Sequence, residues 1–365
     1  MQLISICFLI GTLALQLPFA CLWDDDTIVV EREAFPGAHE MIVGHFARHS
    51  PAYYRWRIDD RSAVPVEQRR PADYDSIAVA HEKLGDHDAA IRTIEDKIQR
   101  WPDTDRYQSE ANLATFLIHA GRLQEGLDHI DRALEINPDA HFGREIYQRM
   151  LVQALLAKDD PTQLPVWPES GSGATGFFRQ QDVDAWEHNP GKSQQDAMEG
   201  VLGMLRFGNH DSPVLLETLG DLLLDQTGWN YGDSEGAKQL AARAYLVASY
   251  QCDEPARSKY REKAISALSM QVGHDIDQVE AELRGELADA AALQEQVAAD
   301  EVAWIAQGVD VDEAFAKKYR KLFEVPIRLG NRIPGGVHWL LWAMLILLAI
   351  VIHCVYQDRR RAKPQ

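Results

Sequence analysis

The sequence has little positive charge and few cysteines. It holds 37 lysines and arginines against 56 aspartates and glutamates, a formal net charge of −19 over 365 residues. A protein that binds nucleic acid presents a basic face to the phosphates, so the acidic balance argues against that class. Only four cysteines are present and none forms a CxxC motif, so neither a thiol oxidoreductase nor a cysteine-rich zinc site is indicated.

Motifs of familiar enzyme classes are also missing. The sequence has no HExxH zinc-protease motif and no phosphate-binding P-loop. Gly171, Gly173 and Gly176 satisfy GxGxxG, but prolines precede them where a dinucleotide-binding fold needs a strand, so we interpret them as a turn. We therefore expect a protein that is not an enzyme and that has no catalytic residues, no cofactor and no metal.

Both ends of the chain are apolar. The first 22 residues carry no charge, which predicts a signal peptide or an uncleaved signal anchor at 1–22, with a lipoprotein signal at Cys21 as an alternative. The twenty residues 337–356 also carry no formal charge and are long enough to cross the hydrocarbon core, at ~1.5 Å per helical residue. We therefore expect one C-terminal transmembrane helix at 337–356.

The charge around this helix predicts its orientation. Residues 357–365 contain a basic cluster that is typical of a cytoplasmic tail. The body would then lie outside the cytoplasm, in the bacterial periplasm or cell envelope. Cys21 and Cys252 would share that oxidising compartment, where they either form a disulfide or leave Cys252 as a lone buried thiol.

Two adjacent segments repeat one pattern with a period of 36 residues, starting at Tyr74 and at Glu110. Each has an amphipathic helix, a turn at Gly85 or Gly121, a second amphipathic helix and a proline that ends it. Neither helix pair could bury its apolar stripe alone, so the two units are expected to stack around a continuous core.

This pattern resembles the tetratricopeptide repeat. The matching residues are Tyr74, Ile77, Ala78, His81, Gly85, Ala90, Ile94 and Pro102 in the first unit, and Leu113, Ala114, Leu117, Gly121, Ile130, Ala133 and Pro138 in the second. Lys97 replaces the expected small residue and Glu110 the expected large apolar one. The resemblance implies an all-α fold with a helical-repeat solenoid over 72–158, in which a third opening helix follows Pro138.

The resemblance also implies a concave binding face, lined by the first helix of each unit. By that analogy the binding residues are Asp75, Val79, Glu82, Lys83, Gln108, Ala111, Thr115, Ile118 and His119. The alternative is an ordinary solvated helix face. The Lys/Asn clamp of chaperone-binding relatives is missing, so a cytosolic chaperone role is not expected.

Residues 23–71 are expected to form an N-terminal helical segment in which Ser50 caps a helix that starts at Pro51. The CLWDDDT opening and the HSPAYY run of this segment resemble membrane-anchored tetratricopeptide-repeat proteins of planctomycete-type bacteria.

Histidines in this segment raise the alternative of a metal site. His45 and His49 are four residues apart on what should be a helix, a spacing that suits two imidazole ligands, and His39 and Glu40 are near in sequence. We interpret them instead as surface or hydrogen-bonded histidines, because no third ligand is obviously placed.

The remaining body divides by composition. Residues 159–197 are rich in proline and glycine and predict a linker. Residues 198–323 read as a second helical block, and 324–336 as a hinge before the membrane.

The function that these features predict is a membrane-tethered scaffold outside the cytoplasm that binds a protein or peptide and performs no catalysis. The alternative is an envelope enzyme or metalloprotein with a site in the second helical block or near His39–His49.

Overall fold

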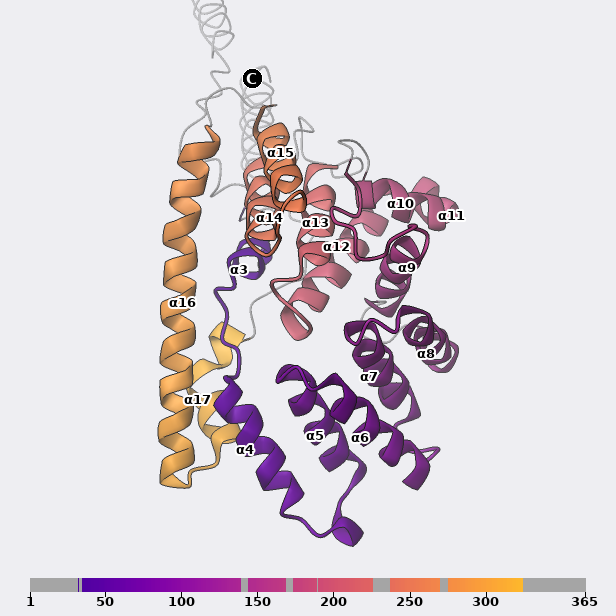
Figure 1. Cartoon of the computed structure of the whole chain (residues 1–365), viewed down its shortest axis with the longest axis vertical. Coiled ribbons are helices and arrows are strands. Elements are labelled where there is room, and N and C mark those ends of the chain that lie inside the picture. Colours follow the sequence, from indigo (N-terminus) through magenta and orange to yellow (C-terminus); the bar gives the residue numbers. More distant parts are fainter. Residues whose placement is uncertain are drawn as a thin grey trace, which may run out of the picture.

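The computed structural model describes Arg32 and residues 35–138, 144–168, 173–188, 190–225, 237–269 and 275–323. Within these ranges the chain forms α-helices and one short 3-10 turn, and no strand (Figure 1). The all-α prediction is confirmed. The predicted signal segment, hinge, transmembrane helix and tail lie outside the described residues, as do Cys21 and Gly171. No described helix combines the length and the apolar character needed to cross a membrane.

The repeat region forms two antiparallel helix hairpins. The first contains α5 (Pro71–Lys83) and α6 (His87–Arg100), and the second contains α7 (Arg106–His119) and α8 (Leu123–Ile136). Gly85 and Gly121 make the two turns with φ of +80° and +79°, a left-handed conformation that favours glycine. The third opening helix predicted after Pro138 is α9 (Arg144–Leu156).

The hairpins stack through their apolar faces. Ala90 and Ile94 of α6 pack in one cluster with Leu117 of α7. Ile130 of α8 packs in a second cluster with Val152 of α9. Each fully buried aliphatic side chain contributes roughly 1.5–3 kcal/mol, so the interfaces between hairpins supply the stability that a single hairpin lacks.

The two residues that depart from the repeat pattern are both buried and both paired. Lys97 is 0% exposed, and its Nζ donates to Asp75 Oδ1 and Oδ2 at 2.8 and 2.7 Å. Glu110 is also 0% exposed and accepts hydrogen bonds from His129 and Arg132. A buried charge needs such a partner, so each departure is balanced by a second polar residue across the helix pair.

The N-terminal segment differs in part from its prediction. Ser50 Oγ accepts a hydrogen bond from Tyr53 N, and α4 (Pro51–Ser62) starts at Pro51 as expected. The helix expected under His45 and His49 is absent, because α3 (Ala38–Val43) ends with Gly44 in the left-handed conformation. A 3-10 turn, η1 (Val66–Gln68), connects α4 to α5.

The predicted linker at 159–197 is helical over much of its length, which corrects that interpretation. It contains α10 (Gly173–Gln181), α11 (Val183–His188) and the start of α12 (Pro190–Phe207). Gly173 is required by packing, since a β-carbon there would lie 2.0 Å from Asp221 Oδ2. The glycines that suggested a turn thus include one that lets α10 approach α13.

The second helical block contains α12, α13 (Pro213–Leu224), α14 (Lys238–Tyr250) and α15 (Ala256–Ser269). α13 starts at Pro213, and the Ser212 side chain caps it, a start signal that the sequence carries. Every residue of α14 from Lys238 to Ser249 is buried. This helix is therefore the centre of the largest hydrophobic core, which also takes in α3.

The last two described helices bring the chain back to its beginning. The 32-residue α16 (Ile276–Gln307) and α17 (Val311–Phe323) form a hairpin at the end of the predicted second helical block. α16 contacts α3, α4 and α14, so the long helix runs beside the N-terminal segment (Figure 1). The helices consequently follow a closed circuit from α4 through the repeats and the second block to α16.

Candidate functional site

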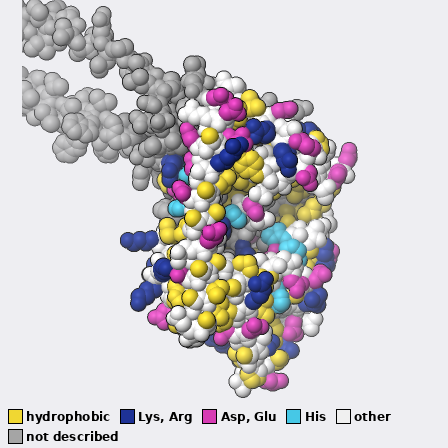
Figure 2. Space-filling model, turned by 60° about the vertical axis from the view of Figure 1, so that its left-hand side comes forward, with side chains coloured by type: hydrophobic (Ala, Val, Ile, Leu, Met, Phe, Trp, Pro, Cys, Tyr) yellow, Lys and Arg dark blue, Asp and Glu magenta, His cyan; other side chains and the backbone are white. Residues whose placement is uncertain are grey.

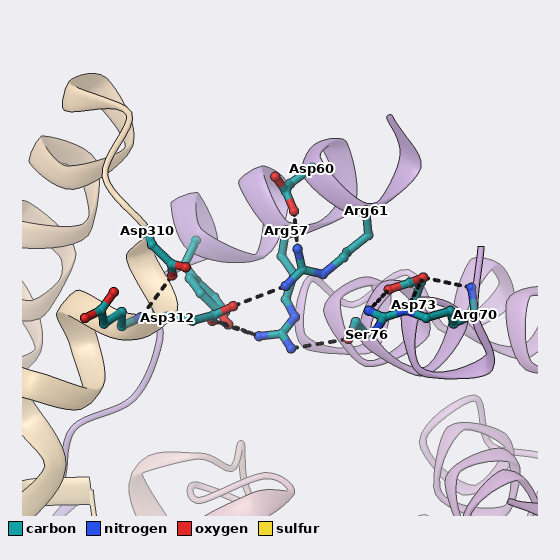
Figure 3. Close-up of polar contacts among 10 residues, drawn as sticks. Arg57, Asp60, Arg61, Arg70, Asp73, Ser76, Asp310 and Asp312 are labelled. Carbon is teal, nitrogen blue, oxygen red and sulfur yellow. Dashed lines mark hydrogen bonds and ion pairs between the residues drawn. The ribbon is translucent and has the colours of Figure 1, made fainter. Parts of the chain in front are cut away.

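The closure between the N-terminal segment and α16–α17 depends on polar contacts. Tyr53 Oη donates to Asp312 Oδ1 at 2.5 Å, and Arg57 reaches both Asp312 and Ser76 of α5 (Figure 3). Arg61 forms a further ion pair with Asp312. The Asp312 carboxylate at the start of α17 thus contacts three side chains of α4. One of them, Arg57, also contacts α5 and so joins α4 to the repeats.

A buried carboxylate makes the second closing contact. Glu301 of α16 is 0% exposed, lies 2.6 Å from His49 Nδ1 and accepts a hydrogen bond from Ser50 N at 2.8 Å. The His49 ring stacks on Tyr53 with 3.6 Å between centroids. His49 is therefore a closing residue, and its predicted alternative as a metal ligand beside His45 has no support in this geometry.

His39 of α3 makes another contact between the N-terminal segment and α16. Its Nε2 lies 3.1 Å from Glu286 Oε2 on α16, and Arg243 of α14 donates to the same carboxylate. Burial opposes ionisation of Glu286, but the contacts from His39 and Arg243 hold its pKa down at about 2. Among the described residues, no group of three or more histidine, cysteine or acidic side chains is placed to hold a metal ion.

The inner sides of the circuit surround a hollow. Figure 2 shows this hollow with histidine side chains gathered around it. On its repeat side, Glu82 of α5 contacts His119 Nδ1 of α7 at 2.5 Å and His87 Nδ1 of α6 at 2.9 Å. Burial would raise the pKa of Glu82, but these two contacts hold it below its usual range.

Lys83 joins the repeats to the second helical block. Its Nζ donates to the carbonyl oxygens of Phe207 and Gly208 at 2.8 and 2.5 Å, at the C-terminus of α12. The C-terminal end of a helix carries a partial negative charge of about −0.5, so a lysine is stabilised there. Burial lowers the pKa of Lys83, with Glu82 opposing this effect and Arg48 adding to it.

Arg48 and His210 complete the opposite rim. Arg48 donates to the Gly44 carbonyl at 2.6 Å and lies over the Phe46 ring. Gly44 needs to be a glycine, because a β-carbon would lie 3.2 Å from Arg48 and from His210 at a φ of +72°. Burial, followed by the charge of Arg48, lowers the pKa of His210 to about 4, against the opposing charge of Asp211.

An exposed aromatic ring stands at the edge of this rim. Phe207 is 51% exposed, and the guanidinium groups of Arg144 and Arg206 lie 5.6 and 5.1 Å from its ring centroid. A ring flanked by cations in this way presents an apolar surface inside a positive environment.

The residues predicted to line a concave face fall into different environments. Asp75 is buried against Lys97, and Val79 and Ile118 pack against the hydrophobic clusters of the repeats. The Thr115 hydroxyl oxygen accepts a hydrogen bond from Gln148 of α9. Gln108 is exposed at the start of α7 and Ala111 is half-buried. Glu82, Lys83 and His119 are the members that meet at the hollow.

A second cluster of titratable groups lies inside the second block. Lys263 of α15 lies 2.7 Å from Glu217 and 2.9 Å from Asp221 of α13, and Tyr260 and Tyr245 donate to the same two carboxylates. Burial opposes protonation of Lys263, but the two carboxylates raise its pKa.

This cluster holds a connecting segment in place. The backbone N–H groups of Val166, Trp167 and Ala174 also donate to the Glu217 and Asp221 carboxylates. Glu217, Tyr245 and Tyr260 are fully buried, so solvent and substrate have no access to them. The arrangement anchors the segment before α10 to α13.

The sequence interpretation missed several residues and one motif. Arg48, Phe207 and His210 come from loops and a helix end without a repeat pattern, so no spacing signals them. Residues 232–236 read GDSEG and fit the GxSxG pattern. A serine-hydrolase elbow needs a strand before it, whereas α13 precedes this segment, which lies outside the described ranges.

The hollow between the repeats and the second block is thus an accessible place where side chains from several elements meet. Comparison with protein-family models and with curated proteins finds no match to this chain.

Proposed function

We propose that this chain is a tetratricopeptide-repeat-like scaffold that binds a protein or peptide segment in the hollow. The single observation that carries the proposal is the meeting of Glu82, His119 and Lys83 on the inner side of the stacked hairpins. These side chains come from α5 and α7, the helices that line the binding face in the resembled family. The proposal includes a membrane tether at 337–356, with the body outside the cytoplasm.

A binding role fits these groups better than the alternative of an enzyme or metalloprotein. The Glu217–Asp221–Lys263 cluster, in the second helical block, is closed to substrate. His39 and His49 are each directed to a different glutamate of α16. In both places the titratable side chains have structural partners, whereas the hollow is open to solvent (Figure 2).

Site-specific crosslinking in cells tests the binding role. A photo-reactive amino acid placed at Gln108 or His119, on the inner side, should crosslink the full chain to a specific partner. The same amino acid at Glu95 or Asp128, exposed on the second helices of the hairpins, provides the matched control. Equal crosslinking at inner and outer positions, or none at the inner ones, would contradict the proposal.

The tether is tested by fractionation. The full chain should sediment with membranes and require detergent for release, whereas a chain that ends after Phe323 should appear in the soluble extracytoplasmic fraction. Retention of the shortened chain in the membrane would place the tether elsewhere.

A further inference from the structure

Two cations at the hollow are held by neutral oxygens. Lys83 donates to the carbonyls of Phe207 and Gly208, and Arg48 donates to the carbonyls of Gly44 and Phe46. Neither of them is in ion-pair contact with a carboxylate within the ranges that the structure describes. Carbonyl dipoles stabilise a cation but leave its net charge in place, so the hollow keeps two positive charges close together.

Two carboxylates lie close enough to affect these cations, and one of them already has hydrogen-bond partners. Asp211 acts on Arg48 from a distance. Glu82 is the carboxylate nearest to Lys83 in sequence, but both of its oxygens already contact His119 and His87. Burial is the main cause of the lowered pKa of His210, and the charges of Arg48 and Lys83 add to it against the opposing charge of Asp211.

This local positive charge contrasts with a chain of net charge −19. Next to it stands Phe207, half-exposed and flanked by two guanidinium groups. A half-exposed aromatic ring gains from packing against an apolar side chain, and Lys83 and Arg48 gain from carboxylates. The two features together match a peptide in which acidic residues surround an apolar one.

We propose that the hollow binds an acidic segment of a partner protein, in which carboxylates face Lys83 and Arg48 and an apolar side chain packs on Phe207. This inference rests on the proposed binding function and specifies the chemistry of the partner. Residues outside the two repeats supply Arg48 and Phe207, so the site requires the closed circuit rather than the repeats alone.

A pair of synthetic peptides tests the charge requirement. The probe is an acetylated and amidated Glu-Glu-Phe-Glu-Glu peptide with a fluorophore, and its control is Gln-Gln-Phe-Gln-Gln. Fluorescence anisotropy with the full chain in detergent should show the glutamate peptide binding at least about tenfold more tightly, with an affinity that falls as salt increases. Equal affinities for the two peptides, or no binding by either, would overturn the inference.

Substitutions in the hollow test its location. Lys83→Met and Arg48→Met should each weaken the glutamate peptide about fivefold or more, and Lys83→Arg should retain most of the affinity. Lys317→Met, which removes an exposed lysine from α17, is the matched control and should change nothing. Phe207→Ala alters an exposed ring and should also weaken the glutamate peptide, so it gives a variant that leaves the half-buried Lys83 and its contacts in place.

The titration of His210 provides an independent readout. In the free chain burial, followed by the charge of Arg48, lowers the pKa of this histidine to about 4, and a bound acidic peptide changes both its burial and the charges around it. Nuclear magnetic resonance of labelled histidines should therefore show a shift at His210, and peptide binding that leaves His210 unchanged would place the peptide elsewhere. If crosslinking at His119 finds a partner but the acidic peptide does not bind, only this inference fails.

Discussion

At the scale of single residues, the departures from the repeat pattern are as informative as the matches. Lys97 and Glu110 occupy positions where the pattern expects a small and a large apolar residue, and each is buried with a partner of opposite charge. The matches could be recognised from the sequence because they follow helical spacing. The partners could not, because a pattern within one helix does not specify which side chain faces it from the next.

Removal of one charge from the Lys97–Asp75 pair should destabilise the first hairpin. Lys97→Met leaves the Asp75 carboxylate buried without its cation, which we expect to cost about 3 kcal/mol. The double variant with Asp75→Leu should recover most of this loss, because no unpaired charge remains. Hydrogen exchange of α5 and α6 measures both effects, and equal losses in the single and double variants would show that the pair is not coupled.

Glu110 should make stability depend on pH in the acid range. Burial opposes its ionisation, but His129 and Arg132 hold the folded pKa at about 2, below the unfolded value of ~4.3. A lowered folded pKa stabilises the fold above the unfolded value, and this stabilisation is lost as pH falls from about 5 towards 2.

The measurement is the difference in unfolding free energy between the wild type and Glu110→Gln across this range. The difference should shrink as pH falls, because both forms are neutral at the lowest pH. Glu95→Gln, an exposed carboxylate on α6, is the control and should show no such trend.

At the scale of elements, periodicity predicted the amphipathic helices but not the helices in a proline- and glycine-rich region. Apolar patterns or capping signals mark the helix pairs α5–α6 and α7–α8, the start of α13 at Pro213 and the α16–α17 hairpin. Helices α10 and α11 are short and α10 contains two glycines, so composition favoured a linker. α10 is stabilised by contacts with α13, and those contacts are not local in sequence.

Two glycine substitutions separate packing from helix propensity. Gly173→Ala should destabilise the start of α10, because its β-carbon would collide with Asp221 and its φ is +45°. Gly285→Ala, on α16, meets nothing within 4 Å and should stabilise that helix by about 0.5–1 kcal/mol. Thermal unfolding of both variants is the measurement, and a stabilising effect at Gly173 would contradict the close packing.

At the scale of the whole molecule, the sequence could predict the order of helical regions but not that they close into a circuit. Apolar stripes show that a helix must pack, without showing that α16 packs on α4. The hollow depends on that closure, since Arg48 lies on the N-terminal segment and Phe207 lies on α12. Glu82, Lys83 and His119 were therefore predictable as a face of the repeats, while the opposite rim was not.

Loss of the buried Glu301 contact should loosen the closure. Glu301→Ala removes the acceptor of Ser50 N–H and the partner of His49, so hydrogen exchange should increase at residues 45–57 and in α17. Glu295→Ala, at an exposed position on the same helix, is the control and should leave these segments protected. Increased exchange confined to α16 would show that the contact does not join the two ends.

The Glu301–His49 contact also bears on the order in which the parts of the chain fold. Its two residues are 252 positions apart in the chain. During synthesis the N-terminal segment therefore emerges long before α16 exists, and contacts over such a distance form late because of their entropic cost. Until then α4 can pack on α5 but lacks its contacts with α16. We expect the nascent chain to pass through an open form in which the repeats are folded. In that form the aromatic residues of α4 would be exposed to chaperones.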